Sequence, residues 1–228
     1  MTSSAPFIHI ENVSKLYGTI RALHRATIKV DEGEFIALIG PSGAGKSTLM
    51  RLLIREELPS EGHIFVASRD ITKLKVSQLP YYRRRLGMVF QDYKLLPHKT
   101  VFENVAFPLE VSGAPDAIIT PTVTKILTLV GLDHRMAAFP KELSGGEAQR
   151  ASIARALVHS PKILLADEPT GNLDPENAKD IIELLLKINK TGTIVILATH
   201  NQAIIERLRK RVVVLKSGEV VFDQRSPQ

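Results

Sequence analysis

Short apolar runs, glycine-rich turns and amphipathic stretches alternate along this 228-residue chain. Four of the runs have the length of a strand and are almost entirely apolar, which is typical of strands buried on both faces of a parallel sheet. They lie at 35–39, 86–90, 163–166 and 193–199. Helical spacing of apolar residues predicts helices at 46–54 and 148–159.

Both ends of the chain have the pattern of antiparallel strands. Residues 7–13 and 26–30 alternate apolar and polar positions, and Tyr17-Gly18 between them is typical of a turn. This pair predicts an antiparallel layer at the edge of the fold. A strand is also expected at 63–66, and a closing hairpin is expected at 212–222.

The segment 100–132 has a helical pattern that proline and glycine interrupt. We expect several short helices, which together form an inserted helical subdomain. The expected breaks are at Pro108, Gly113, Pro115 and Pro121.

The composition indicates a globular chain, with 44% hydrophobic and 24% charged residues, long enough to bury one substantial core with room for a small inserted subdomain. No run approaches the roughly 18 apolar residues of a membrane span. Residues 1–6 lack the basic and apolar regions of a signal peptide, which argues against export. The absence of cysteine is consistent with the cytoplasm.

The net charge of +6 gathers in two clusters, 83–85 and the group Arg207, Arg209, Lys210 and Arg211. One interpretation is a solvated face, and the other is contact with an anionic membrane surface or an acidic partner. Aromatic residues are not interleaved with the second cluster, so a stacking platform for single-stranded nucleic acid is not indicated.

A glycine-rich loop, G-x-x-x-x-G-K-S, joins the strand 35–39 to the helix 46–54. Its glycines let consecutive backbone N–H groups and the helix N-terminus point at one anion. Lys46 would then reach the β- and γ-phosphates of a nucleotide, and the Ser47 hydroxyl would hold Mg²⁺. The predicted phosphate site comprises Gly40, Pro41, Ser42, Gly43, Ala44, Gly45, Lys46, Ser47 and Thr48.

A second stretch, Ser144-Gly145-Gly146-Glu147, precedes the helical segment 148–159. A hydroxyl and free N–H groups at a positive helix end can contact a phosphate. A simple helix cap with a turn is the commoner meaning of such a motif. Beside a phosphate-binding loop, we expect it to be a second phosphate-contacting element.

Two acids, Asp167 and Glu168, end the apolar run 163–166. Buried carboxylates are costly unless a cation or a catalytic task compensates. We expect Asp167 to support Mg²⁺ and Glu168 to polarise a water aimed at the γ-phosphate. Asp174, which precedes Pro175, fits an N-cap or a surface acid better.

Polar residues also end two other predicted strands. Gln91 follows 86–90, where it could reach Mg²⁺ or the attacking water. His200 follows 193–199 and is a candidate donor to the γ-phosphate. Tyr17, upstream of the loop, could stack on a base or could be a surface residue of an edge strand.

The chain resembles the ATP-binding subunits of ABC systems over almost its whole length. The resemblance rests on seven elements in this order: Tyr17, GPSGAGKST, Gln91, LSGGE, ILLADE, GNLD and His200. The resemblance implies an α/β fold, a P-loop NTPase of the ABC type. Its core sheet is mixed or parallel and flanked by helices, with an N-terminal antiparallel β layer and an inserted α-helical subdomain. It implies one nucleotide-binding domain, 1–228, with that subdomain at about 92–158.

The resemblance also implies the cofactors ATP and Mg²⁺ and a homodimer in which two chains complete two ATP sites. Tyr17 would lie on adenine, Gln91 would link Mg²⁺ to the helical subdomain, and Ser144–Glu147 would contact the ATP of the second copy. Many relatives carry glutamine at the position of Glu147, so the local electrostatics can differ here. The implied catalytic residues are Lys46, Gln91, Glu168 and His200; the implied metal-site residues are Ser47, Gln91 and Asp167; and Asp174 would lie at the dimer seam.

Within the family, segments 90–96, 99–101, 104–106 and 166–175 are similar to the FtsE subfamily of bacterial cell-division ATPases. That similarity implies an FtsX-like integral membrane partner, control of peptidoglycan hydrolases and a place on the inner face of the plasma membrane. Lipoprotein-releasing and macrolide-exporter ATPases share the motif ADEPTGNLD. The alternative is therefore the ATPase subunit of a transporter for lipoproteins, macrolides or another solute. No nucleic acid partner is expected, because the chain has no long coiled coil, zinc module or second cassette.

Overall fold

The computed structural model describes residues 5–201, 204–205 and 208–224 and places a six-stranded mixed sheet at its centre. The strand order is β10-β9-β3-β8-β7-β6, in which only β10 runs antiparallel to its neighbour. The strands are β3 (Phe35–Ile39), β6 (Leu86–Val89), β7 (Ile163–Asp167), β8 (Ile194–Thr199), β9 (Arg211–Lys216) and β10 (Glu219–Gln224). The predicted core strands and the closing hairpin are confirmed.

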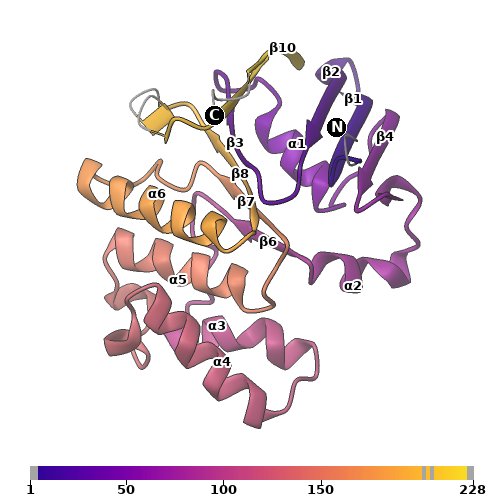
Figure 1. The fold of residues 1–228 in the computed structure, drawn as a ribbon. Helices are drawn as coiled ribbons and strands as arrows, with labels where there is room; N and C mark the ends of the chain where they lie inside the picture. Colours follow the sequence, from indigo (N-terminus) through magenta and orange to yellow (C-terminus); the bar gives the residue numbers. More distant parts are fainter. Residues whose placement is uncertain (1–4, 202–203, 206–207, 225–228) are drawn as a thin grey trace.

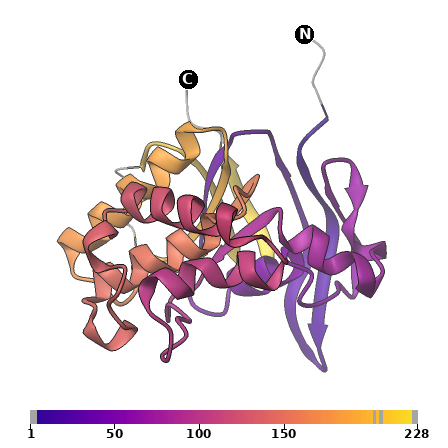
Figure 2. The ribbon, with the colours of Figure 1, turned by 90° about the horizontal axis from the view of Figure 1, so that it is seen from below.

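A second, antiparallel sheet has the order β2-β1-β4-β5. It comprises β1 (Ile8–Tyr17), β2 (Ile20–Val30), β4 (Glu61–Val66) and β5 (Arg69–Asp70). Figure 2 shows this sheet, coloured indigo to purple, on one side of the molecule and most of the helices on the other. The predicted N-terminal antiparallel layer is therefore confirmed.

The helices cover both faces of the core sheet (Figure 1). They are α1 (Lys46–Leu53), α2 (Leu79–Arg83), α3 (Val101–Val111), α4 (Asp116–Leu129), α5 (Gly145–Leu157) and α6 (Pro175–Lys190). Side chains of β3 alternate between two cores: Ala37 packs with α3–α6, and Ile36 and Leu38 pack with α1 and the antiparallel sheet. Burial on both faces explains why these strands have no polar alternation. None of the described helices is long and apolar enough to cross a membrane.

The helical segment has fewer breaks than its prolines predict. Pro108 lies inside α3 and Pro121 inside α4, so the expected breaks at these two residues are wrong. Buried residues on the same helices, such as Leu109 and Val123, anchor them in the core, and this packing offsets the hydrogen bond that each proline removes. The break lies at Gly113, which has a φ of +78°, and Pro115. A separate subdomain at 92–158 stays a prediction.

The sequence patterns did not predict helix α6. Asp174 caps it and Pro175 is its first residue, which is a strong start signal. Ile181, Leu185 and Ile188 on its apolar face are buried against the core.

Arg211 was assigned to a basic surface cluster, but it is only 5% exposed. Its Nη2 donates to Asp223 at 2.6 Å and its Nη1 donates to Glu34 at 3.0 Å and to the Lys29 carbonyl at 2.7 Å. These bonds join β9 to β10 and to the segment before β3. Arg211 therefore has a structural role as the cation of a buried ion-pair network with Glu34 and Asp223. Arg207 of the same cluster lies outside the described residues.

Replacing Arg211 with leucine should destabilise the fold, because two carboxylates lose their cation. We expect the free energy of unfolding in urea to fall by about 3 kcal/mol. As a matched control, Lys179→Leu removes an exposed ion pair with Glu183 and should cost less than about 0.5 kcal/mol. Equal losses in the two variants would contradict the role of Arg211.

Candidate functional site

The loop between β3 and α1 closes around a cavity of about 350 Å³. Gly43 and Gly45 have φ angles of +77° and +104°, which disfavour any residue with a side chain. A Cβ on Gly45 would also lie 2.5 Å from the Ala22 carbonyl oxygen. The cavity is lined by Ala22, Ser42, Gly43, Ala44, Gly45, Lys46, Ser47, Thr48, Gln91, Glu168 and His200.

Lys46 is held at the mouth of this loop and is only 6% exposed. Its Nζ donates to the carbonyl oxygens of Gly40 at 2.7 Å and Pro41 at 3.2 Å. The same Nζ lies 3.5 Å from Glu168 Oε1. A cation beside free backbone N–H groups makes the loop a site for a multiply charged anion.

Glu168 and His200 face each other across two neighbouring strands. The register of β7 and β8 pairs Asp167 with Ala198, and the Glu168 N–H donates to the Ala198 carbonyl at 2.9 Å. Glu168 Oε1 lies 2.9 Å from His200 Nδ1, and the His200 backbone N–H donates to Oε2 at 3.4 Å. The positive φ of Glu168, +49°, is uncommon for a residue with a side chain and is typical of functional sites.

Asp167 lies at the end of β7 with one carboxylate oxygen, Oδ1, buried and without a hydrogen-bond partner. Burial raises the pKa of this carboxyl, whereas the Ser47 hydroxyl and the Lys46 cation act in the opposite direction. An orphaned buried oxygen is costly, and hard cations take oxygen ligands. The donor set of Asp167 and Ser47 therefore fits Mg²⁺.

Gln91 lies beside this cavity and contacts the loop after β7. Its side-chain Nε2 is 3.5 Å from Asn172 Oδ1, and its backbone carbonyl accepts from Asn172 Nδ2 at 3.2 Å. A second cavity of about 500 Å³ is lined by Gln91, Asp167 and Asn172, among others. Gln91 thus separates the phosphate-loop cavity from the Asp167 side. Asn172 was not assigned a role of its own, although the motif GNLD contains it.

Tyr17 lies next to the start of α1 rather than in the lining of the cavity. Its hydroxyl donates to Glu57 Oε2 at 2.6 Å, and Lys15 Nζ lies 5.0 Å from its ring centroid. Burial and the hydrogen bond to Glu57 raise the pKa of Tyr17, and Thr48 acts against them. The ring is 38% exposed, so both interpretations of Tyr17 stay open.

Ser144–Glu147 forms the N-terminus of α5 and does not line the phosphate-loop cavity. Ser144 Oγ accepts from the Glu147 N–H at 3.2 Å, and Glu147 Oε2 accepts from the Ser144 N–H at 2.8 Å. Arg135 Nε donates to Glu147 Oε1 at 2.9 Å, a contact 12 residues away that no sequence signal indicated. The hydrogen bond from the Ser144 N–H, and the contact with Arg135 in addition, lower the pKa of Glu147 to about 2.

Asp174 caps α6, as its sequence context indicates. Its Oδ1 accepts from the N–H groups of Glu176 and Asn177, both at 3.0 Å. These contacts and the Asn177 side chain lower the pKa of Asp174. Within one chain, then, residues 42–48 of the loop, Gln91, Glu168 and His200 line one cavity, and Asp167 joins them through the Ser47 hydroxyl from the neighbouring cavity. The other predicted site residues do not line the phosphate-loop cavity: Tyr17, Gly40, Pro41, Ser144–Glu147 and Asp174.

The family model described as "ABC transporter" matches residues 23–171. The chain is 45% identical to the "Cell division ATP-binding protein FtsE" of Bacillus subtilis, covering 95% of this chain and 96% of that protein. Identity to FtsE of Streptococcus pneumoniae is 50%, covering 95% of each. The "Methionine import ATP-binding protein MetN" of Bordetella avium is 45% identical over 94% of this chain, which spans 60% of that protein.

A solved structure has the same fold. It is the "Dimeric structure of a post-hydrolysis state of the ATP-binding cassette MJ0796 bound to ADP and Pi", with a TM-score of 0.87 and 33% identity. The match covers 97% of this chain and 99% of that one. The α/β fold of an ATP-binding cassette is therefore confirmed.

Replacing Glu168 with glutamine should stop hydrolysis but not nucleotide binding, since the amide keeps the shape of the site and loses the base. We expect phosphate release to slow by about 10²–10⁴-fold, with ATP affinity changed only a few-fold. The control Glu11→Gln alters an exposed acid of β1 and should match the wild type in both assays. Normal turnover in Glu168→Gln would remove this residue from its predicted role.

The lowered pKa of Glu147 predicts a pH-dependent contribution to stability. Its ionised form is favoured in the folded state, so the contribution is full above the ordinary value of 4.5 and is lost as pH falls towards about 2. Glu147→Gln should therefore be less stable than wild type at neutral pH, with the gap in urea midpoint narrowing below about pH 5. Exposed Glu183→Gln should show no such gap. A gap that is constant with pH would count against the contacts of Glu147.

Proposed function

Because this chain belongs to the ABC transporter family, and is an ATPase of the ABC type, we propose that it is the ATP-hydrolysing subunit of an FtsE-type membrane complex. The single observation that carries the proposal is the similarity to FtsE proteins at 45–50% identity along 95–96% of their length. The four FtsE segments noted in the sequence agree with it.

In the proposed mechanism, ATP joins two copies of the chain. The loop 40–48 holds the phosphates of one ATP, and Ser144–Gly146 of the second copy contacts the same γ-phosphate. This composite site is supported by the capped, positive end of α5, which lies outside the cavity lining of its own chain. The named neighbour MJ0796 is likewise a dimeric cassette.

Glu168 would orient the attacking water, and the contacts of its carboxylate with Lys46 on one side and His200 on the other support this role. Lys46 would neutralise charge that develops on the phosphoryl oxygens. His200 would hold the Glu168 carboxylate in place and donate to the γ-phosphate. Asp167 and Ser47 would hold Mg²⁺, with Gln91 close by, and the ion would supply further neutralisation of phosphate charge.

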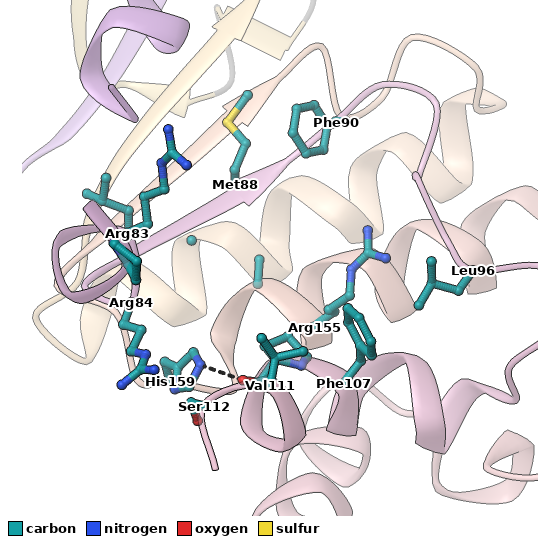
Figure 3. A pocket seen from close by; sticks show the side chains of 15 residues that line it. Arg83, Arg84, Met88, Phe90, Leu96, Phe107, Val111, Ser112, Arg155 and His159 are labelled. Carbon is teal, nitrogen blue, oxygen red and sulfur yellow. Dashed lines mark hydrogen bonds between the residues drawn. The ribbon is translucent and has the colours of Figure 1, made fainter. Parts of the chain in front are cut away.

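The membrane partner would dock in a groove that includes Phe90, the residue before Gln91 (Figure 3). This groove, of about 480 Å³, includes Met88 and Phe90 of the segment before Gln91 and Phe107 and Val111 of α3. Val111 is 70% exposed and Phe107, one turn earlier on α3, is 37% exposed, so the two give the groove an apolar surface. Arg83 and Arg84 lie at one end of the groove, so a partner segment with an apolar face and an acidic residue would complement it.

The groove is connected to the ATP site by Arg155 of α5. The Arg155 guanidinium donates to the carbonyls of Lys94 at 2.6 Å and Tyr93 at 2.9 Å, which are three and two residues after Gln91. A displacement of Gln91 that moves Tyr93 and Lys94 would therefore also move Arg155, which lines the groove. ATP binding and hydrolysis would in this way change the shape presented to an FtsX-like integral membrane protein. That protein would hold the ATPase at the inner face of the plasma membrane and pass the signal to peptidoglycan hydrolases.

A second candidate is the ATPase subunit of a solute transporter. The specific observation in its favour is the 45% identity to a methionine import ATP-binding protein, which equals that to one of the FtsE proteins. The chemistry at the ATP site would be the same, and only the membrane partner would differ.

Co-expression with an FtsX-like protein, followed by co-purification from detergent, tests the proposal. We expect the two proteins to purify together, and Val111→Asp to abolish this while ATP binding persists. The control Leu129→Asp changes another exposed apolar residue, 58% exposed on α4 and away from the groove, and should leave co-purification intact. Co-purification with a methionine-type permease instead, and not with the FtsX-like protein, would favour the second candidate.

A further inference from the structure

A cavity of about 650 Å³ lies at the edge of the core sheet opposite the ATP site. It adjoins Leu86 and Ile163, which pair as the first residues of β6 and β7. The phosphate loop, Glu168 and His200 follow the carboxyl ends of β3, β7 and β8 instead. The five residues of β7 thus separate the two sites by about 13 Å.

The walls of this cavity are aromatic and apolar. Phe7, Tyr81 and Tyr82 contribute rings, and Val66 and Ile71 add aliphatic side chains. The Tyr82 hydroxyl donates to the Leu53 carbonyl at 2.6 Å, which fixes its ring against α1. A volume of this size is within the range of pockets that take small organic ligands, roughly 300–1,000 Å³.

Three cations, Arg69, Arg85 and Lys162, also line the cavity. Within residues 5–201, 204–205 and 208–224, none of their side chains has a hydrogen-bond or salt-bridge partner, and no Asp or Glu lines the cavity. Nearby arginines differ: Arg55 and Arg83 donate to backbone carbonyls. The nearest acid in sequence, Asp70, is already engaged by Thr72 and His63.

We propose that this cavity is an accessory binding site for an organic anion that joins an apolar or aromatic body to a phosphate, sulfonate or carboxylate group. The rings would contact the body, and the three cations would contact the anionic group. A lipid headgroup with its glycerol and a soluble aryl phosphate share this chemistry.

Helix α2 forms a wall of this cavity and of the groove proposed for the membrane partner. Tyr81 and Tyr82 face the cavity, and Pro80 and Arg83 line the groove. A bound anion would therefore contact the helix that borders the groove. This effect on the groove rests on the proposed function. The binding test below does not involve the membrane partner, so the accessory site and the proposed function can fail separately.

The test uses the fluorescent anion anilinonaphthalene sulfonate with the full chain, after a saturating non-hydrolysable ATP analogue has filled the phosphate loop. We expect Arg69→Gln/Lys162→Gln to weaken probe binding about tenfold or more, since two charge-assisted contacts are lost. The matched control Lys125→Gln/Lys187→Gln removes two exposed lysines that lie outside the cavity and should keep the wild-type affinity. The neutral probe phenylnaphthylamine should bind both double variants equally.

Competition identifies the source of the anion. Displacement of the probe by short-chain phosphatidylglycerol or by phenyl phosphate supports the site and names a lipid or a soluble ligand, respectively. Equal binding by the two double variants, or displacement by neither competitor, would overturn the proposal. If the first double variant fails to fold, Tyr81→Ala, at a side chain 69% exposed, provides the same test through the aromatic wall.

Discussion

The candidate site depends on charged side chains, those of Lys46, Asp167 and Glu168, that are largely buried together at one edge of the core sheet. Lys46 is almost fully buried, its Nζ is 3.5 Å from Glu168, and Asp167 keeps an unpartnered buried oxygen. An unsatisfied group of this kind costs about 1–3 kcal/mol, and buried ion pairs add little net stability. The arrangement therefore adds little to the stability of the fold, as expected for residues with the chemical roles proposed above. Apolar packing on both faces of β3, β7 and β8 stabilises the domain around it.

The parallel strands of the core sheet bring the residues of the candidate site together. Because β3, β7 and β8 run in the same direction, the phosphate loop, Glu168 and His200 emerge at one edge although more than 150 residues separate the first from the last. Positive φ angles at Gly43, Gly45 and Glu168 aim the backbone and the carboxylate at the same space. The end of α5 is different, since Ser144 and Glu147 cap each other and Arg135 neutralises the added carboxylate. The N-terminus of α5 is the end at which a helix dipole favours an anion, which is why we propose that it contacts a phosphate held by another copy.

Sequence patterns were most reliable where local physics and burial agree. Apolar runs revealed the core strands, and the phosphate loop was identifiable because its glycines, lysine and serine each have a required place. Pro108 and Pro121 misled because tertiary packing outweighs the local cost of a proline in a helix. The sequence suggested a surface charge at Arg211 because nothing in it indicates its partners. Glu34 is 177 residues away and Asp223 is 12 residues away. The contacts of Arg135 with Glu147 and of Asn172 with Gln91 likewise arise only from tertiary structure.

We propose above all that a working ATP site needs the loop of one chain and the Ser144 region of another. The most direct test mixes two inactive variants, Lys46→Ala and Ser144→Asp; aspartate keeps the helix cap but repels phosphate. Mixed dimers contain one site in which both parts are intact, so phosphate release should recover to well above the sum of the separate variants. No recovery on mixing, with dimer exchange verified, would contradict a site shared between two chains.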